Sequence, residues 1–505
     1  MTFAATLRDV LIAHQRHQPE AALLIAPETQ QVLTYAKLGK ETRQLAARYA
    51  QHALIPGDHV GFLLHNGYQT TTIFLGTMVA GLVVTPLNLL AHGAQLAYVL
   101  EHSDVKLVFT SVHYEAQLRS ALLLMASERS SSIRVEVIDS DAPDAHAGFG
   151  EIELDESAGG LSPALLMYTS GTTGQPKGAL LTHANLLHAA RAVCDWHRLT
   201  SADRVLSSLP LYHINGQCIA TIAPFVSGGS IIAPHRFSAS AWWAWVARYE
   251  PTWLNLVPTI IAYLLNAVNG NTRLWPSIRF ARSASAPLPP DQHRAFEATF
   301  GIGVIEAMGM TECASVVFCN PQQPGARKYG TPGLPCGVEA RVVSTETGAV
   351  LGDGDTGELH LRGDNVMLGY YNAPEKTADA MTSDGWLRTG DLGHRDADGF
   401  YFVTGRIKEL IIKGGENIAP REIDEALLAH PAVLEAAAVG IPDANYGQEI
   451  LAAIVLKPGV QCDEMSLREH CVRVLGRYKT PKIFRFVDEL PKGPSGKVQR
   501  LKLLD

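Results

Sequence analysis

The sequence has few of the features that mark secreted or metal-stabilised proteins. Its seven cysteines occur singly, with no Cys-x-x-Cys pair, which argues against a disulfide framework and against a zinc site. Residues 1–20 include His and Arg where a signal peptide needs an unbroken apolar stretch. We therefore expect a reducing compartment and predict a cytoplasmic protein.

A net positive charge and a long apolar run are also missing. Asp and Glu total 50 against 42 Lys and Arg, a formal net charge of −8, so no overall basic field favours nucleic acid. The most apolar stretch, residues 76–90, is interrupted by Pro86 and is too short to span a bilayer. We expect a monomer or homodimer without a membrane span, whose partners are small molecules.

The first half of the chain has the pattern of an α/β domain. At 505 residues the chain exceeds the size of about 250–300 residues at which a single core stops growing. Short apolar runs bounded by Gly or Pro alternate with helical patterns, and this alternation predicts mainly parallel sheets with ligands at the strand ends. The runs are residues 60–64, 107–110, 161–168, 230–234 and 253–257.

The second half predicts two smaller units. Short strands at 339–344, 357–362 and 400–404 are separated by Gly and Asp turns, which indicates a small antiparallel barrel or sheet. Beyond residue 405 we expect a helix at 420–430 and strands at 436–441 and 452–456. The predicted architecture is a large N-terminal domain of mixed, mainly parallel sheets sandwiched by helices (1–405, with a β-barrel subdomain at about 330–405), a hinge (406–409) and a smaller, mobile C-terminal α+β lid domain (410–505).

Residues 168–178, YTSGTTGQPKG, have the composition of a phosphate-binding loop. Glycines allow the backbone to approach an anion, hydroxyl groups add donors, and Lys177 adds a charge. The Walker pattern does not fit, because Lys177 follows proline and no Ser or Thr comes after it. A flexible surface turn is the alternative. Residues 352–357, GDGDTG, satisfy G-x-G-x-x-G but precede a strand, so we interpret them as a hairpin loop.

Six further motifs follow the loop in a fixed order. They are LPLYHINGQ (209–217), SASAPL (283–288), EAMGMTEC (306–313), WLRTGD (386–391), GRIKELIIKGGENIAP (405–420) and LPKGPSGKVQR (490–500). Together the motifs resemble the adenylate-forming enzyme superfamily of acyl-CoA synthetases, nonribosomal adenylation domains and luciferases. The resemblance runs from about residue 10 to the C-terminus and is nearest to small-acid CoA ligases such as oxalate–CoA ligase.

The resemblance implies an ATP-dependent acid–thiol ligase. A carboxylate and ATP would give acyl-AMP and pyrophosphate, and coenzyme A would then give acyl-CoA and AMP. Such phosphoryl chemistry depends on positioning and charge neutralisation. The resemblance makes Glu312 the Mg²⁺ ligand, Thr311 a donor to the α-phosphate, and Lys497 the catalytic lysine that reaches the reacting groups from the small domain. For isolated residues, a helix cap with a solvated acid and a solvated lysine are the alternatives.

The resemblance also assigns the nucleotide-binding residues. Asp391 would accept bonds from the ribose hydroxyls with Arg406 beside it, although a surface-turn acid is the alternative for Asp391. Met308 departs from the family, which usually has an aromatic residue there, so we expect weaker adenine binding. The predicted ATP/AMP-binding residues are Thr169, Ser170, Gly171, Thr172, Thr173, Gly174, Lys177, Ser285, Ala286, Pro287, Ala307, Met308, Gly309, Thr311, Asp391 and Arg406.

Two sets of residues in the C-terminal part would serve the thioester step. Lys408 occupies the family's hinge position, from which the small domain would rotate. The residues expected to contact coenzyme A are Lys413, Gly414, Gly415, Tyr446, Tyr478 and Lys482. Thr480 takes a position that is basic in some relatives.

The acyl pocket is predicted to suit a small polar or anionic acid. By family position it contains His213, Asn215, Gly216, Arg282, Ser283, Ala284, Cys313 and Val316. Asn215 and Gln217 are polar, which disfavours a fatty acid tunnel or an aryl slot. His213 is either a catalytic or acid-binding group or a structural histidine, and Arg282 pairs either with a second negative group of the substrate or with a structural acid.

Three functions stay open from the sequence. The first is the CoA ligase, with an aryl or fatty acyl-CoA ligase as a variant of it. The second is a stand-alone adenylation domain that loads a carrier protein, although no carrier domain is fused. The third is a nucleotide-binding protein without catalysis, which Lys497, Glu312 and Asp391 argue against.

Overall fold

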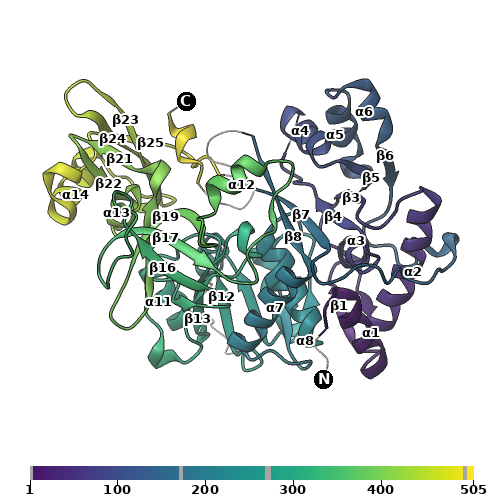
Figure 1. Cartoon of the computed structure of the whole chain (residues 1–505). Helices are drawn as coiled ribbons and strands as arrows, with labels where there is room; N and C mark the ends of the chain where they lie inside the picture. Colours follow the sequence, from purple (N-terminus) through teal and green to yellow (C-terminus); the bar gives the residue numbers. More distant parts are fainter. Residues whose placement is uncertain (1–3, 92, 170–174, 268–274, 493–497, 505) are drawn as a thin grey trace.

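The computed structural model describes residues 4–504 except 92, 170–174, 268–274 and 493–497 (Figure 1). The predicted loop residues Ser170, Gly171, Thr172, Thr173 and Gly174 and the predicted catalytic Lys497 therefore lie outside the described residues. In the part of the chain that is described, no helix is long and apolar enough to cross a membrane.

A seven-stranded sheet forms the first half of the large domain. Its strands β3 and β4 are buried along their whole length, and such strands suit a sheet covered on both faces. In order across the sheet the strands are β18 (Gly369–Tyr370), β8 (Lys177–Thr182), β7 (Pro163–Thr169), β4 (Val83–Pro86), β3 (His59–Leu63), β5 (Val105–Thr110) and β6 (Arg134–Val137).

A nine-stranded sheet lies beside the first. Strands β9 to β13 and β1 run parallel, and antiparallel strands complete both edges. In order they are β15 (Leu334–Pro335), β14 (Phe318–Cys319), β13 (Val304–Met308), β12 (Phe280–Ser283), β11 (Trp253–Leu256), β9 (Arg204–Leu206), β10 (Ser230–Ile232), β1 (Ala22–Ala26) and β2 (Gln31–Thr34).

Helix α3 (Tyr68–Val79) joins the two sheets. All of its residues are buried, and it packs against β1 and β2 of the nine-stranded sheet and β3 and β4 of the seven-stranded sheet. Its buried threonines are satisfied inside the helix, where the Thr71 and Thr72 hydroxyls donate to the Gly67 and Tyr68 carbonyls. On its outer side α3 contacts α1 (Leu7–His17) and α2 (Tyr35–Gln51), whose first turns are capped by Thr6 and Thr34.

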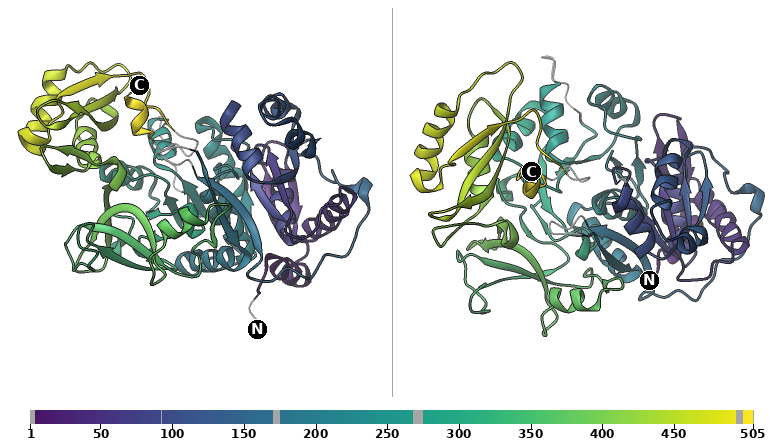
Figure 2. Two further views of the ribbon diagram at one scale, coloured as in Figure 1. Left: turned by 45° about the horizontal axis from the view of Figure 1, so that its top comes forward. Right: turned by 90° about the horizontal axis from the view of Figure 1, so that it is seen from above.

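The other helices of the large domain flank the sheets (Figures 1 and 2). Helix α7 begins with a capping box between Thr182 and Asn185. These helices are α4 (Gly93–His102), α5 (Val112–Leu122), α6 (Ser127–Ser132), α7 (His183–His197), α8 (Ala223–Ser227), α9 (Ala239–Tyr249), α10 (Pro258–Asn266), α11 (Pro290–Phe300) and α12 (Pro374–Ala380).

The region at about 330–405 is a four-stranded antiparallel sheet with β16 and β20 at its edges. Its strands are β16 (Glu339–Val343), β17 (Gly357–Arg362), β19 (Leu387–Arg395) and β20 (Tyr401–Arg406). Residues 352–356 lie directly before β17, which begins at Gly357, and open no helix, as expected for a hairpin loop.

The C-terminal part gathers at one end of the molecule, opposite α4–α6 (Figures 1 and 2). It has apolar clusters of its own, drawn from residues 411 onwards. Its elements are β21 (Ile411–Lys413), β22 (Glu416–Ile418), α13 (Pro420–Leu428), β23 (Val433–Asp443), β24 (Gly447–Leu456), α14 (Glu464–Lys479) and β25 (Ile483–Phe486). The predicted α/β fold with a smaller α+β part is confirmed, whereas the domain limits at 405 and 410 stay predictions.

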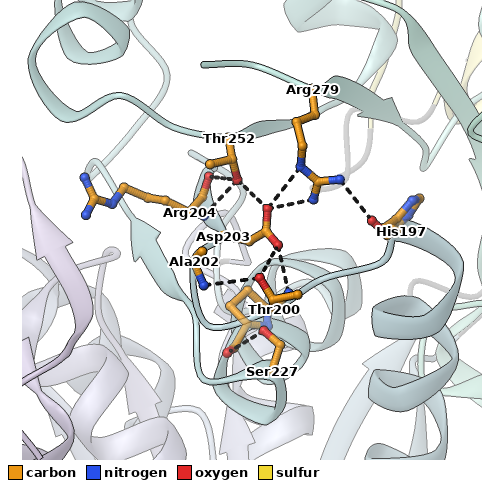
Figure 3. Close-up of polar contacts among 9 residues, drawn as sticks. His197, Thr200, Ala202, Asp203, Arg204, Ser227, Thr252 and Arg279 are labelled. Carbon is orange, nitrogen blue, oxygen red and sulfur yellow. Dashed lines mark hydrogen bonds and ion pairs between the residues drawn. The ribbon is translucent and has the colours of Figure 1, made fainter. Parts of the chain in front are cut away.

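Asp203 anchors the amino ends of three neighbouring strands (Figure 3). Its side chain accepts hydrogen bonds from the backbone N–H of Thr200 at 2.8 Å and from the hydroxyl of Thr252 at 2.8 Å. Arg279 donates to it from Nη2 at 2.6 Å and also bonds the His197 carbonyl at 3.4 Å. Asp203 is 8% exposed, so this network fixes the starts of β9, β11 and β12 in a low-dielectric setting.

Replacing Asp203 with Asn is expected to destabilise the large domain. The change removes the ion pair with Arg279 and leaves that guanidinium without its carboxylate, which costs about 1–3 kcal/mol of unfolding free energy because the pair is partly solvated. Differential scanning calorimetry measures the loss. Asp291→Asn is the matched control, since its pair with Arg294 is exposed and contributes little. An equal shift in both variants would contradict the role of Asp203.

Candidate active site

A cavity of about 720 Å³ lies where the two parts of the chain meet. Its wall comes from segments at the ends of strands β4, β7, β12 and β13, together with Arg406 to Glu409 and Val498 to Lys502. The carboxyl edge of parallel strands is the usual ligand site of open α/β sheets. The predicted site residues on this wall include Thr169, Lys177, His213, Asn215, Thr311 and Glu312.

Thr311 and Glu312 are presented by a tight turn after β13. Gly309 precedes them, and a Cβ there would lie 1.7 Å from the Ser315 carbonyl oxygen, so only glycine fits without rearrangement. Ala314 and Ser315 both have positive φ angles, 47° and 87°, which is uncommon outside glycine and is concentrated at functional sites. The turn therefore holds Thr311 and Glu312 against the cavity in one geometry.

Glu312 has the surroundings expected of a magnesium ligand. Its carboxylate borders the cavity and accepts a hydrogen bond from the Tyr370 hydroxyl at 2.8 Å. The ammonium of Lys177 lies 4.7 Å from the centre of the same Tyr370 ring. Carboxylate oxygen is a hard ligand of the kind Mg²⁺ takes, with phosphate oxygens completing the shell. Glu312 is thus the residue that would hold Mg²⁺, which neutralises phosphate charge when bound.

The turn predicted to contact adenine is held from two sides. Ser285 has a φ of 75°, and its hydroxyl accepts a hydrogen bond from the Asn215 side chain at 3.1 Å. The backbone N–H of Leu288 donates to buried Glu306 at 3.1 Å. In the described part of the wall, Ala284, Ser285 and Gly309 border the cavity, whereas Ala286, Pro287, Ala307 and Met308 do not.

Asp391 and Arg406 face each other across strands β19 and β20. The two residues are register partners, and Arg406 Nε donates to Asp391 Oδ1 at 2.7 Å. The charge of Asp391 raises the pKa of Arg406. Asp391 is 3% exposed, and its Oδ2 atom has no hydrogen-bond partner among the residues described. A buried acceptor of this kind is suited to a ligand hydroxyl.

The acyl-pocket residues separate into wall and core. His213 and Asn215 border the cavity, and Asn215 begins a π-helix (Asn215–Ile222), a rare element that recurs at functional sites. Gly216 lies so close to Pro210 that a Cβ would come within 2.4 Å of its carbonyl oxygen. Ser283, Cys313 and Val316 are buried in the core, outside the cavity wall as described.

Arg282 lies directly behind Asn215. It is fully buried, and its Nη1 donates to Asn215 Oδ1 at 3.4 Å, while Asn255 donates to the same oxygen at 3.1 Å. The described residues provide no carboxylate partner for Arg282, and its Nε and Nη2 make no hydrogen bond there. Although burial would raise the pKa of the Cys319 thiol, the neighbouring Cys336, His197 and Arg282 bring it below its ordinary value.

Four of the residues predicted to contact coenzyme A form one cluster outside the cavity wall. Lys413 Nζ lies 2.9 Å from Glu449 and within 5.5 Å of the ring centres of Tyr446 and Tyr478. Gly414 contacts the same two tyrosines. Lys482 is paired with Asp443 at 2.7 Å, and Gly415 is exposed.

The last segment of the chain, unlike that cluster, forms part of the cavity wall. Residues 498–502 border it, and Arg500 ties this segment to Asp424 of α13 and to Glu409, the latter at 3.3 Å. Ile407 to Glu409 form a short 3-10 helix on the same wall, so the predicted hinge residue Lys408 faces the cavity.

Several wall residues have no counterpart in the predictions from sequence. Tyr370 and Lys376 border the cavity with the predicted residues, yet neither lies in a motif of the sequence. Arg388 stands inside WLRTGD, and Arg500 ends LPKGPSGKVQR, so position within a motif could have indicated both.

Glu306 makes the stability of this site depend on pH. Burial raises the pKa of Glu306 from 4.5 to about 7, partly offset by the hydrogen bond from Leu288. The folded protein therefore keeps a proton that the unfolded chain releases above pH 4.5, and stability falls as the pH rises from about 4.5 to 7.

Glu306→Gln is expected to remove that fall. Relative to the variant, the wild-type unfolding free energy should drop by up to about 3 kcal/mol between pH 5 and pH 8. Melting temperatures across this range measure the difference. Glu346→Gln, at an exposed position, is the control. Parallel curves for wild type and Glu306→Gln would contradict an elevated pKa.

Comparisons with known proteins cover both parts of the chain. Residues 11–371 match the AMP-binding enzyme family, and residues 422–497 match the AMP-binding enzyme C-terminal domain. A sulfoacetate–CoA ligase of Cupriavidus necator is 54% identical, covering 99% of this chain and 97% of that protein. An oxalate–CoA ligase of Arabidopsis thaliana is 35% identical over 93% of this chain and 92% of its own length.

Solved structures have the same fold. ATP-bound MatB from Rhodopseudomonas palustris is 32% identical with a TM-score of 0.91, covering 99% of this chain and 98% of that one. The o-succinylbenzoate coenzyme A synthetase of Bacillus subtilis, in complex with ATP and magnesium ion, is 30% identical with a TM-score of 0.85, covering 98% and 99%.

Proposed function

Because this chain belongs to the AMP-binding enzyme family, as an AMP-forming acid–CoA ligase, we propose that its acid is a two-carbon carboxylate bearing a second anionic group. Sulfoacetate is the first candidate, since a sulfoacetate–CoA ligase is 54% identical over 99% of the chain. Oxalate, named for a more distant relative, is the second.

The resemblance to small-acid CoA ligases is confirmed, as is the predicted use of ATP, Mg²⁺ and coenzyme A. The carrier-protein alternative is not favoured. The cytoplasmic location and the monomeric or dimeric state stay predictions.

The buried charge of Arg282 supports a doubly anionic acid. A desolvated guanidinium without a carboxylate partner among the described residues raises the potential of its surroundings, and Asn215, to which Arg282 donates, borders the cavity. Asn215 accepts from Arg282 with its oxygen, so its amide N–H₂ is turned away, toward Ser285. Arg282 thus acts as a positioning residue that makes the pocket electropositive.

Other residues divide between the two half-reactions in this proposal. Glu312 holds Mg²⁺ at the phosphates, Asp391 and Arg406 bind ribose, and Thr311 donates to the α-phosphate. These groups lower the energy of charge that develops as the acid carboxylate attacks phosphorus. Lys497 supplies a further cation, supported by its motif alone, and the Lys413, Tyr446 and Tyr478 cluster receives coenzyme A after the small domain rotates.

A panel of acids tests the substrate proposal. Purified protein with ATP, Mg²⁺ and free coenzyme A should release pyrophosphate and form a thioester detectable by mass spectrometry, without any carrier protein. We expect kcat/KM for sulfoacetate to exceed that for acetate by at least about tenfold, the equivalent of roughly one well-placed charge interaction. A preference for acetate, or for long-chain or aryl acids, would overturn the proposal.

Arg282 variants test the origin of that preference. Arg282→Gln should reduce the sulfoacetate-to-acetate ratio of kcat/KM toward one, whereas Arg282→Lys, which keeps the charge, should retain part of it. The ratio does not depend on the fraction of folded enzyme, so a merely structural role would leave it unchanged. An unaltered ratio in Arg282→Gln would assign selectivity to other residues.

The hinge assignment predicts a selective defect. Lys408→Pro fixes φ near −65° and removes a backbone rotation that domain movement would need. We expect pyrophosphate release in the adenylation step to persist while thioester formation falls at least about tenfold. Lys408→Ala is the control for the lost charge. Equal loss of both steps in the proline variant would speak against a hinge at this position.

A further inference from the structure

A histidine–aspartate cluster lies between the two large sheets, apart from the cavity described above. His65 follows β3 and Asp141 follows β6, both in the seven-stranded sheet, whereas His235 follows β10 of the nine-stranded sheet. Their candidate ligand atoms all lie within 4.8 Å of one another. We propose that these three side chains bind a divalent transition-metal ion, represented by Zn²⁺, that clamps the two sheets together.

The distances between the three side chains are compatible with a shared metal ion. His235 Nε2 lies 2.8 Å and His65 Nε2 lies 3.8 Å from Asp141 Oδ2. Zinc bonds of about 2.0 Å place tetrahedral ligand atoms roughly 3.3 Å apart, between these two values. The Nε2 atoms of both histidines are buried, and both converge on the Asp141 carboxylate.

The chemistry of the three ligands also suits zinc. Two imidazoles and one carboxylate form a recurrent zinc donor set that leaves one position for water. Two neutral imidazoles and one carboxylate carry a single negative charge, which a dication more than offsets. The side chains are 13–27% exposed, so the ion and its water have a path from solvent.

The backbone around the ligands is already fixed. The N–H of Asp141 donates to Asp139 at 3.0 Å, and the N–H of His235 donates to Glu28 at 3.0 Å. Asn66, next to His65, donates to the carbonyls of Leu209 and Pro234 and accepts from the N–H of Leu211. Ordered ligands lower the entropy lost on metal binding.

The clamp would also support residues 209–213, the segment that brings His213 to the cavity wall. Asn66 ties the His65 segment to residues 209–211, directly before His213 on the cavity wall. The sequence argued against zinc because its cysteines are unpaired. A site built from histidine and aspartate needs no cysteine, and its ligands come from three segments that only the fold brings together.

Zinc binding by the full chain tests the proposal. Chelator-stripped wild type, equilibrated with limiting ZnCl₂ and dialysed, should retain about one more equivalent of zinc than His235→Gln or Asp141→Asn by elemental analysis. His113→Gln, an exposed histidine on α5, is the matched control and should bind like wild type. Zinc should raise the melting temperature of wild type and the control but not of the two variants.

Three results would overturn the proposal. These are wild-type protein that binds no zinc, equal zinc in wild type and both variants, or equal zinc-induced stabilisation in all of them. Asp141→Asn keeps the size of the side chain, and circular dichroism without zinc verifies that each variant is folded. Equal zinc content combined with lower metal-free melting temperatures of the two variants would leave only a hydrogen-bonded structural triad.

Discussion

The burial of α3 between the two large sheets is the constraint on which the rest of the molecule depends. Every residue of this helix is removed from water, and it contacts four strands, two from each sheet. Apolar burial of this extent, about 1.5–3 kcal/mol for each large side chain, fixes how the sheets sit relative to one another. Their carboxyl edges then approach each other, which is why segments distant in sequence, such as 212–215 and 309–312, share one cavity wall.

The sequence predicted the elements better than the directions of their side chains. Buried strands such as β3, β5 and β11 were visible as short apolar runs, and the motifs located the turn of Thr311 and Glu312. Family position also pointed to Cys313 and Val316 as pocket residues, yet both are buried and lie outside the cavity wall. The chain changes direction at Ala314 and Ser315, which both have positive φ angles. Because neither residue is a glycine, the sequence did not indicate this turn.

Arg282 and Glu306 illustrate why residue type alone did not decide burial. Each lies in a strand in which all or nearly all residues are buried. The side chains of both are completely or almost completely removed from solvent. An enclosed charge depends on groups brought from elsewhere, here Asn215 for the arginine and the Leu288 amide for the glutamate. Such partners follow from the fold and cannot be found from local spacing.

The contact between Gly309 and the Ser315 carbonyl limits how this pocket can be redesigned. Directed evolution of acid specificity has almost no freedom at position 309, since any side chain would push the turn of Thr311 and Glu312 out of place. Neighbouring Met310, which also borders the cavity and is only partly buried, offers a flexible thioether whose size can change without moving the backbone. Substitutions that change the size of the pocket are therefore expected to disturb the backbone least at Met310, the residue after Gly309.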